Sequence, residues 1–149
     1  MSGLYSTTAV AVLAILGAAR FASSPRPLAP RSSWNPFELV SVSPSSWPTI
    51  PGLPLNTRDL HASSVIVRGE LAFGPPTSVD LWFEVSPGSW VLNVLPVSGS
   101  SVVASLPNGR VEWSLTTPHQ ITPGIAPGRV GVTVSHGYAS SNPLAGRFP

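Results

Sequence analysis

The chain contains no cysteine, no lysine and few charged residues of any kind. Its 149 residues include eight arginines and six acidic residues, so charged side chains make up only 9% of the sequence. Soluble globular domains carry about 25% charged residues. The absence of cysteine excludes disulfide bonds and thiolate zinc sites. So little charge is a poor basis for solubility as a free monomer, which favours burial of the surface in an assembly or attachment to a membrane.

Tight nucleic-acid binding is also disfavoured, because the arginines do not form a cluster. The formal net charge is only +2, and tight binding to nucleic acid needs many basic contacts with phosphates. Arg26 and Arg31 lie in the Pro/Ser-rich segment 23–33. We consider them candidates for a weak contact with RNA phosphates or lipid headgroups. The alternative is that they are solvated linker charges.

The usual catalytic motifs are absent. The sequence contains no G-x-S-x-G, no phosphate-binding P-loop and no H-E-x-x-H. Asp80 and Glu84 lie about 13 Å apart on an expected strand, which is too far for a retaining glycosidase pair and long for an inverting one. Ser135 and His136 are adjacent, so on a strand they point to opposite faces. We therefore predict no enzymatic activity, no catalytic residue and no cofactor.

The three histidines do not predict a metal site. His61, His119 and His136 are widely separated, and nothing in their spacing places them together. Asp59 and His61 lie two residues apart and could interact locally. We therefore predict no metal ligands.

The first 33 residues are predicted to form an apolar arm or helix followed by a Pro/Ser-rich arm or linker. Residues 9–19 are continuously apolar, but a membrane-spanning helix needs about 20 residues. Extension to residues 4–22 makes a candidate membrane anchor. Ala19 ends a candidate signal peptide that lacks the usual preceding positive charge. The third alternative is an arm that packs on a neighbouring surface.

From residue 36 the sequence shows short strand patterns separated by turns, and its 18 prolines and 13 glycines disfavour long helices. The expected strands are residues 37–42, 63–73, the two arms of a hairpin over 78–97 with its turn at 86–89, 100–106, 109–115 after an Asn-Gly turn, and 129–139. Gly69 is expected to mark a bulge, residues 43–60 and 116–128 to be loops, and the tail from residue 140 to be irregular. This pattern predicts an all-β domain over 34–149, an antiparallel β-sandwich or small barrel of about seven to eight strands.

Alternation along the first hairpin places a tryptophan between two acids. One face of the strand carries Asp80, Trp82 and Glu84, and the other carries the apolar residues Val79, Leu81, Phe83 and Val85. Because aromatic side chains are enriched at protein interfaces, we predict that Asp80, Trp82 and Glu84 lie at a subunit interface. The alternatives are ordinary exposed acids, and a strand that is buried on both faces.

The other tryptophans are expected to divide between the interface and the core. Trp34 and Trp47 lie in Pro-rich segments, and we predict that they anchor an arm on a neighbouring subunit. Trp90 shares its parity with Leu92 and Val94, which predicts a core position for Trp90.

Four short pieces of the chain together resemble a known family. They are NPFELVSV (35–42), LHASSVIVRG (60–69), PPTSVDLWFEVSPGS (75–89) and GRVGVTVSHGYASSNPL (128–144), which cover about a third of the sequence. In this order they are similar to coat proteins of small icosahedral plant viruses of the tymovirus and marafivirus type. The resemblance implies a jelly-roll subunit that assembles with copies of itself into a virion, with RNA enclosed but not gripped by a basic arm.

The sequence therefore favours a structural, self-assembling subunit, most consistent with a viral coat (capsid) protein that forms a shell around nucleic acid. The first alternative is a β-domain anchored in a membrane by residues 4–22, as a virion membrane protein or an accessory subunit of a membrane complex. The second alternative is a secreted binding module that is cleaved after Ala19.

Replacement of Trp82 by alanine is expected to weaken self-assembly more than folding. Truncation of an interface hot spot costs about 2 kcal/mol or more, and a symmetric assembly repeats each contact. Sedimentation would measure the assembled fraction, and circular dichroism the folded fraction. Loss of the fold, with normal assembly of whatever folded protein remains, would contradict the prediction.

Overall fold

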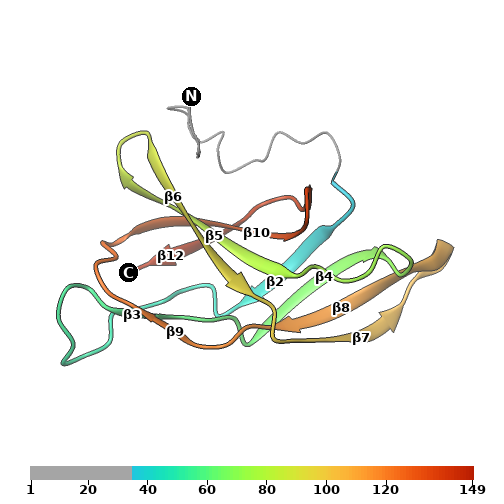
Figure 1. Ribbon diagram of the computed structural model, residues 1–149, viewed down its shortest axis with the longest axis horizontal. Helices are drawn as coiled ribbons and strands as arrows, with labels where there is room; N and C mark the ends of the chain where they lie inside the picture. The colour runs from blue at the N-terminus through green and yellow to red at the C-terminus, as the bar shows by residue number, and fades with distance from the viewer. Residues whose placement is uncertain (1–34) are drawn as a thin grey trace. The chain divides into compact units, whose positions relative to one another are not determined.

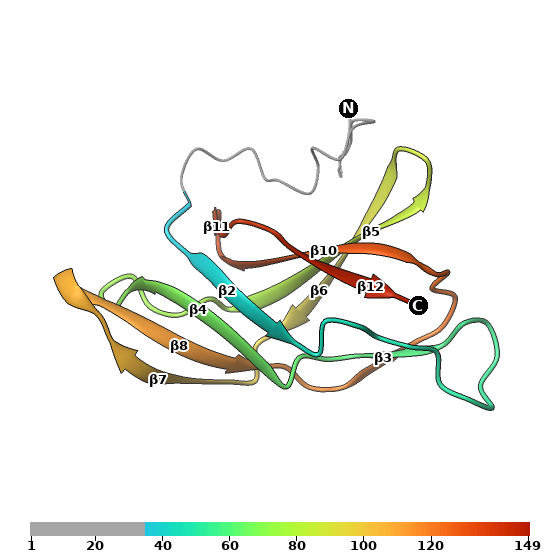
Figure 2. The same cartoon turned by 180° about the vertical axis from the view of Figure 1, so that it is seen from behind.

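The computed structural model describes residues 35–149, which form an all-β structure of antiparallel sheets (Figures 1 and 2). This confirms the predicted antiparallel β-sandwich class. The predicted N-terminal arm or helix, together with Trp34, Arg26 and Arg31, lies outside the described residues. In chain order the strands are β2 (Glu38–Ser43), β3 (Arg58–Leu60), β4 (Ser64–Glu70), β5 (Ser78–Ser86), β6 (Ser89–Pro96), β7 (Gly99–Ser105), β8 (Arg110–Thr116), β9 (Gln120–Thr122), β10 (Gly128–His136), β11 (Ala139–Ser140) and β12 (Leu144–Phe148).

Helical structure is almost absent from this part of the chain. Between residues 35 and 149 a single short 3₁₀ turn, Pro107–Gly109, precedes β8. Among the same residues, no helix has the length and apolar character needed to cross a membrane.

Four strands form the first sheet in the order β2, β4, β8 and β7 (Figure 1). The register places Val67 between Leu39 on β2 and Trp113 on β8, and all three side chains are buried. The hairpin formed by β7 and β8 turns at Asn108 and Gly109, which both have positive φ angles (63° and 74°). These angles are those that an Asn-Gly turn supplies, so the second predicted hairpin is confirmed.

The second sheet has the order β11, β10, β5 and β6, and β12 also pairs with β10. β12 pairs with residues 128–132 of β10, whereas β11 pairs with residues 135–136. The expected irregular tail is therefore wrong, because the chain turns after His136 and returns as two short strands. Buried apolar side chains from both sheets form the core, among them Leu39, Val65, Val67, Val79, Leu81, Trp113, Leu115, Val130, Val132, Val134 and Phe148.

The two segments expected to be loops contain one further pair of strands. β3, within 43–60, pairs with β9, within 116–128 (Figure 2). Each strand has only three residues, and prolines lie close by in both segments. A stretch this short carries no readable alternation, which explains why the sequence pattern did not predict it.

The C-terminal segment covers the free edge of β2. The Leu39 N–H donates to Asn142 Oδ1 (2.8 Å), and Asn142 Nδ2 donates to the Leu39 carbonyl (3.3 Å). Farther along, the Trp47 N–H donates to the Arg147 carbonyl (3.1 Å), and the Arg147 N–H donates to the Ser45 carbonyl (3.0 Å). Main-chain groups that an edge strand leaves open are thus satisfied here. Within residues 35–149, β6 and β7 are end strands of their sheets with no further strand beside them.

Gly69 does not form the predicted bulge. It lies opposite Val111 in an unbroken register, and the register shifts of this sheet occur between Leu39 and Ser41 and between Val102 and Ala104. Two aromatic rings lie directly on Gly69 instead. A Cβ atom there would lie 2.9 Å from Trp113 Cζ3 and 3.0 Å from Phe37 Cδ1. Close packing of aromatic rings on the backbone therefore accounts for this glycine.

Replacement of Gly69 by alanine is expected to lower the free energy of unfolding by about 1–3 kcal/mol, because overpacking forces the two rings to move. Urea denaturation would measure the loss. Gly128→Ala is the matched control in another strand, since a Cβ there meets no atom within 4 Å. Equal stability of Gly69→Ala and Gly128→Ala would show that the rings yield without cost.

Candidate functional site

A cluster of one carboxylate and two imidazoles lies on the β3–β9 pair. In this pair Asp59 is opposite Ile121 and Leu60 is opposite Gln120. One further step of the same antiparallel register brings His61 opposite His119. Because Asp59 and His61 are two residues apart, their side chains share a face. The strand register therefore gathers three side chains that the linear spacing did not connect.

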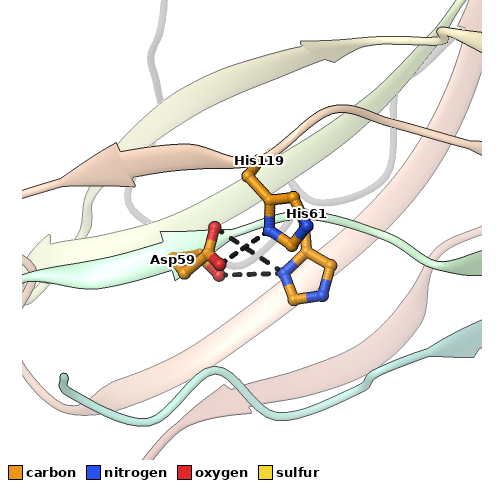
Figure 3. A group of neighbouring side chains, drawn as sticks. All are labelled: Asp59, His61 and His119. Atoms are coloured by element: carbon orange, nitrogen blue, oxygen red, sulfur yellow. Dashed lines mark hydrogen bonds and ion pairs between the residues drawn. The ribbon is translucent and has the colours of Figure 1, made fainter.

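The two imidazoles approach the carboxylate from the same side, as Figure 3 shows. His119 Nδ1 lies 2.7 Å from Asp59 Oδ2, and His61 Nδ1 lies 3.8 Å from Asp59 Oδ1. His61 Nδ1 also lies 3.3 Å from the Asp59 carbonyl oxygen. The ring centroids of His61 and His119 are 4.4 Å apart, with planes inclined by 32°. One potential ligand atom from each of the three residues lies within 4.8 Å of the other two.

Solvent reaches this cluster from one side. The side chain of His119 is 69% exposed, whereas Asp59 and His61 are partly buried. The arrangement has two chemical capabilities. It can hold a divalent metal ion through two imidazole nitrogens and a carboxylate oxygen. It can also form a histidine–carboxylate hydrogen-bonded pair, which orients an imidazole.

Arg58 supports β3 from the opposite face and is fully buried. Its Nε donates to the Ile125 carbonyl (2.9 Å), and its Nη1 donates to main-chain oxygens of Trp47 (2.6 Å) and Pro149 (2.9 Å). The guanidinium carbon also lies 5.1 Å from the centre of the Phe148 ring, a cation–π distance. Burial lowers the pKa of Arg58. No sequence pattern marks this residue, because its partners are main-chain groups from distant segments.

Trp47 belongs to the core of its own chain, so its predicted role as an anchor on a neighbouring subunit is wrong. Its side chain is buried, and its indole N–H donates to the His61 carbonyl (2.8 Å). The ring packs edge-on against Phe148 at a centroid distance of 6.0 Å. A tryptophan in a Pro-rich segment can equally fold back onto its own domain, and here the hydrogen bond to His61 fixes it there.

Asp80 is also buried within its own chain, contrary to the predicted interface position. It is 6% exposed, and its neighbours Val79 and Leu81 are buried as well. Ser78 Oγ donates to Asp80 Oδ1 (2.9 Å). Burial raises the pKa of the Asp80 carboxyl to about 6, although side-chain hydrogen bonds from Ser135, Ser78 and Thr133 favour its ionised form. This end of β5 is covered on both faces, which alternation alone does not reveal.

Residues 82–92, the distal part of the hairpin formed by β5 and β6, group apart from the other described residues. The chain turns at Pro87 and Gly88, as predicted, and the Gly88 N–H donates to Glu84 Oε2 (2.7 Å). Trp82 and Glu84 are half-buried. Their predicted place at a subunit interface remains a prediction.

The predicted core position of Trp90 is wrong. Val85 on β5 and Leu92 and Val94 on β6 are exposed, and Trp90 is only half-buried. Its parity with Leu92 and Val94 predicted a core position because shared apolar parity normally marks a buried face. Here the apolar side chains face solvent in the isolated chain.

Comparison with models of known protein families, with curated proteins and with solved structures finds no match to this chain.

The buried Asp80 carboxyl predicts a pH-dependent stability. Its pKa in the folded chain, about 6, exceeds the ordinary value of 3.8. Between these values the folded state binds more protons than the unfolded state, so the free energy of unfolding falls as pH rises. The expected contribution is on the order of 2 kcal/mol at pH 4 and is lost by about pH 7.

Urea denaturation of the native chain and of Asp80→Asn at pH 4 and pH 7 would measure this effect. The other titrating groups contribute equally to both proteins, so the difference between the two pH profiles isolates Asp80. The variant is expected to lose the Asp80 contribution. Parallel profiles for the two proteins would mean that Asp80 is not responsible.

Proposed function

We propose that this chain is a structural subunit that assembles with copies of itself into a shell, as a viral coat protein does. The observation that carries the proposal is the character of two end strands. Neither β6, SWVLNVLP, nor β7, GSSVVAS, contains a charged residue. Five of their aliphatic side chains are 40–51% exposed: Val91, Leu92, Val94, Val102 and Val103.

An end strand of this kind is poorly protected against pairing with another chain. Its outer main-chain N–H and C=O groups have no partner strand, and soluble monomers usually guard such edges with lysine, proline or a strong bulge. β7 has one register shift, between Val102 and Ala104, but no charge and no proline. Pairing would satisfy its main-chain groups and remove apolar surface from water, at about 25 cal/mol for each Å² buried.

A second copy of this chain is the partner that the composition favours. With a formal net charge of +2, identical subunits repel one another only weakly. In an assembly with closed symmetry, the same contact would recur at every subunit. The resemblance to tymovirus and marafivirus coat proteins supports the same conclusion. Trp82 and Glu84 are candidates for a second contact.

Nucleic acid would be enclosed rather than tightly held. Each contact between a basic side chain and a phosphate adds affinity through counterion release. Because the eight arginines of the chain are dispersed, few such contacts can form together. Arg26 and Arg31 are the proposed sites of weak, non-specific contact with RNA. Binding that weak would leave shell formation to contacts between subunits.

Expression of the full chain, followed by density-gradient sedimentation and negative-stain microscopy of each fraction, tests the proposal. Fast-sedimenting, uniform shells are the expected result. Two results would contradict it. One is a monomer at every concentration tested, and the other is protein that floats with lipid vesicles, which would support anchoring by residues 4–22.

A lysine placed on the end strand is expected to block assembly. Val102→Lys introduces a charge that pairing of β7 would bury, and an uncompensated buried charge costs several kcal/mol. We expect the association constant of the contact to fall at least about tenfold, which corresponds to about 1.4 kcal/mol, while the melting temperature of the subunit changes little. Leu71→Lys is the matched control, since Leu71 is similarly exposed but lies in the turn after β4. Equal assembly of Val102→Lys and Leu71→Lys would place the contact elsewhere.

A further inference from the structure

We propose that Asp59, His61 and His119 bind one zinc ion. This site is separate from the proposed assembly edge. Its residues flank or belong to β3 and β9, whereas the assembly edge belongs to β6 and β7. The inference therefore does not depend on the proposed function.

The donor set is the first argument. Imidazole nitrogen combined with carboxylate oxygen is a common zinc set, whereas Ca²⁺ and Mg²⁺ prefer sites made of oxygen alone. Three protein ligands leave the fourth tetrahedral position open to water or to an external ligand. The exposed side chain of His119 gives an ion access to the cluster from solvent.

The geometry is the second argument. In a tetrahedral site with bonds of about 2.0–2.1 Å, ligand atoms lie about 3.3–3.4 Å from one another. In this chain His119 Nδ1 is 2.7 Å from Asp59 Oδ2, and His61 Nδ1 is 3.8 Å from Asp59 Oδ1. The two distances end on different oxygens of the carboxylate, and one ligand atom from each of the three residues lies within 4.8 Å of the other two. Coordination of one ion requires the three side chains to turn until one ligand atom from each lies about 3.3–3.4 Å from the others.

An unsatisfied carboxylate oxygen is the third argument. Asp59 Oδ1 is buried and accepts no hydrogen bond from the described residues. A buried acceptor without a partner costs about 1–3 kcal/mol, and more when it carries charge. The hydrogen bond between His119 and Asp59 engages Oδ2 and leaves Oδ1 unsatisfied. A cation between Oδ1 and the His61 ring satisfies it, which a histidine–carboxylate pair alone does not.

The opposite face of β3 does not compete for the ion. Although Arg58 carries a positive charge next to Asp59 in the sequence, its guanidinium points into the core, where it binds three main-chain oxygens. Ile121, opposite Asp59 on β9, supplies a neutral neighbour on the face of the cluster. The only charged group that this pair of strands presents to the imidazoles is thus the Asp59 carboxylate.

A zinc ion here would link two segments that are distant in the sequence. His61 directly follows β3, and His119 directly precedes β9. Coordination would hold the end of this short strand pair closed. Metal ligation that closes a long chain loop stabilises the fold by restricting the unfolded chain.

Isothermal titration of ZnCl₂ into the full chain, prepared without a histidine tag and freed of metal with a chelator, tests the inference. The expected result is one zinc ion per chain. His61→Ala and His119→Ala should each weaken binding at least about tenfold, since even loss of a group that only orients a ligand costs 10–100-fold. His136→Ala is the matched control, because His136 bonds to the Pro75 carbonyl and lies outside the cluster. It should bind zinc as the native chain does.

Three results would overturn the inference: no zinc binding by the native chain, unchanged binding in both His61→Ala and His119→Ala, or an equal loss in His136→Ala. Circular dichroism would verify that each variant folds. If His61→Ala does not fold, the exposed His119 still decides the question. Imidazole NMR signals of the native chain give a second readout, in which zinc should shift His61 and His119 but not His136.

Discussion

The pairing of β3 with β9 depends on the hydrogen bonds of the buried Arg58 guanidinium. The guanidinium binds main-chain oxygens of Trp47, Ile125 and Pro149, which come from three distant segments. Burial of a cation is costly unless hydrogen bonds compensate for lost water. The three main-chain oxygens and the Phe148 ring provide part of that compensation, whereas Arg58 Nη2 has no hydrogen-bond partner among the described residues. Because the Trp47 segment and the C-terminus meet at Arg58, β3 is held in place to pair with β9. The Asp59 cluster exists only where that pairing exists.

The outer edge of β2 is covered by other parts of the chain, whereas the outer edges of β6 and β7 are not covered by any described strand. The edge of β2 is capped by the Asn142 side chain, and the segment that follows β2 is bonded to Arg147. β6 and β7 lack any comparable cover among residues 35–149 and present uncharged, aliphatic surface. This contrast in cover is the structural basis of the proposed assembly at β6 and β7. The weak overall charge fits the proposed assembly, because it reduces the electrostatic cost of bringing identical surfaces together.

Local pattern predicted the strands that have one buried face and one exposed face. β4 and β8 follow the expected alternation, and both predicted hairpins occur. In β2 the alternation stops after Leu39, where the register shifts. Prediction failed where burial does not alternate, as at Asp80, whose strand is covered on both faces. It also failed for β3 and β9, because each strand has only three residues, too few to show an alternation of apolar and polar side chains. The meeting of His61 with His119 depends on the register of that pair, and a register between distant segments leaves no local signal.

Hydrogen exchange at the β7 amides tests the central claim, that this edge is where copies of the chain meet. Exchange would be followed in assembled material and in dilute, dissociated protein, with β2 as the internal reference because its edge is already covered. If copies of the chain meet at this edge, assembly will slow exchange at the outward-facing amides of Gly99–Ser105 and leave β2 unchanged. Assembled protein in which β7 exchanges as fast as it does in the monomer would show that the copies meet elsewhere.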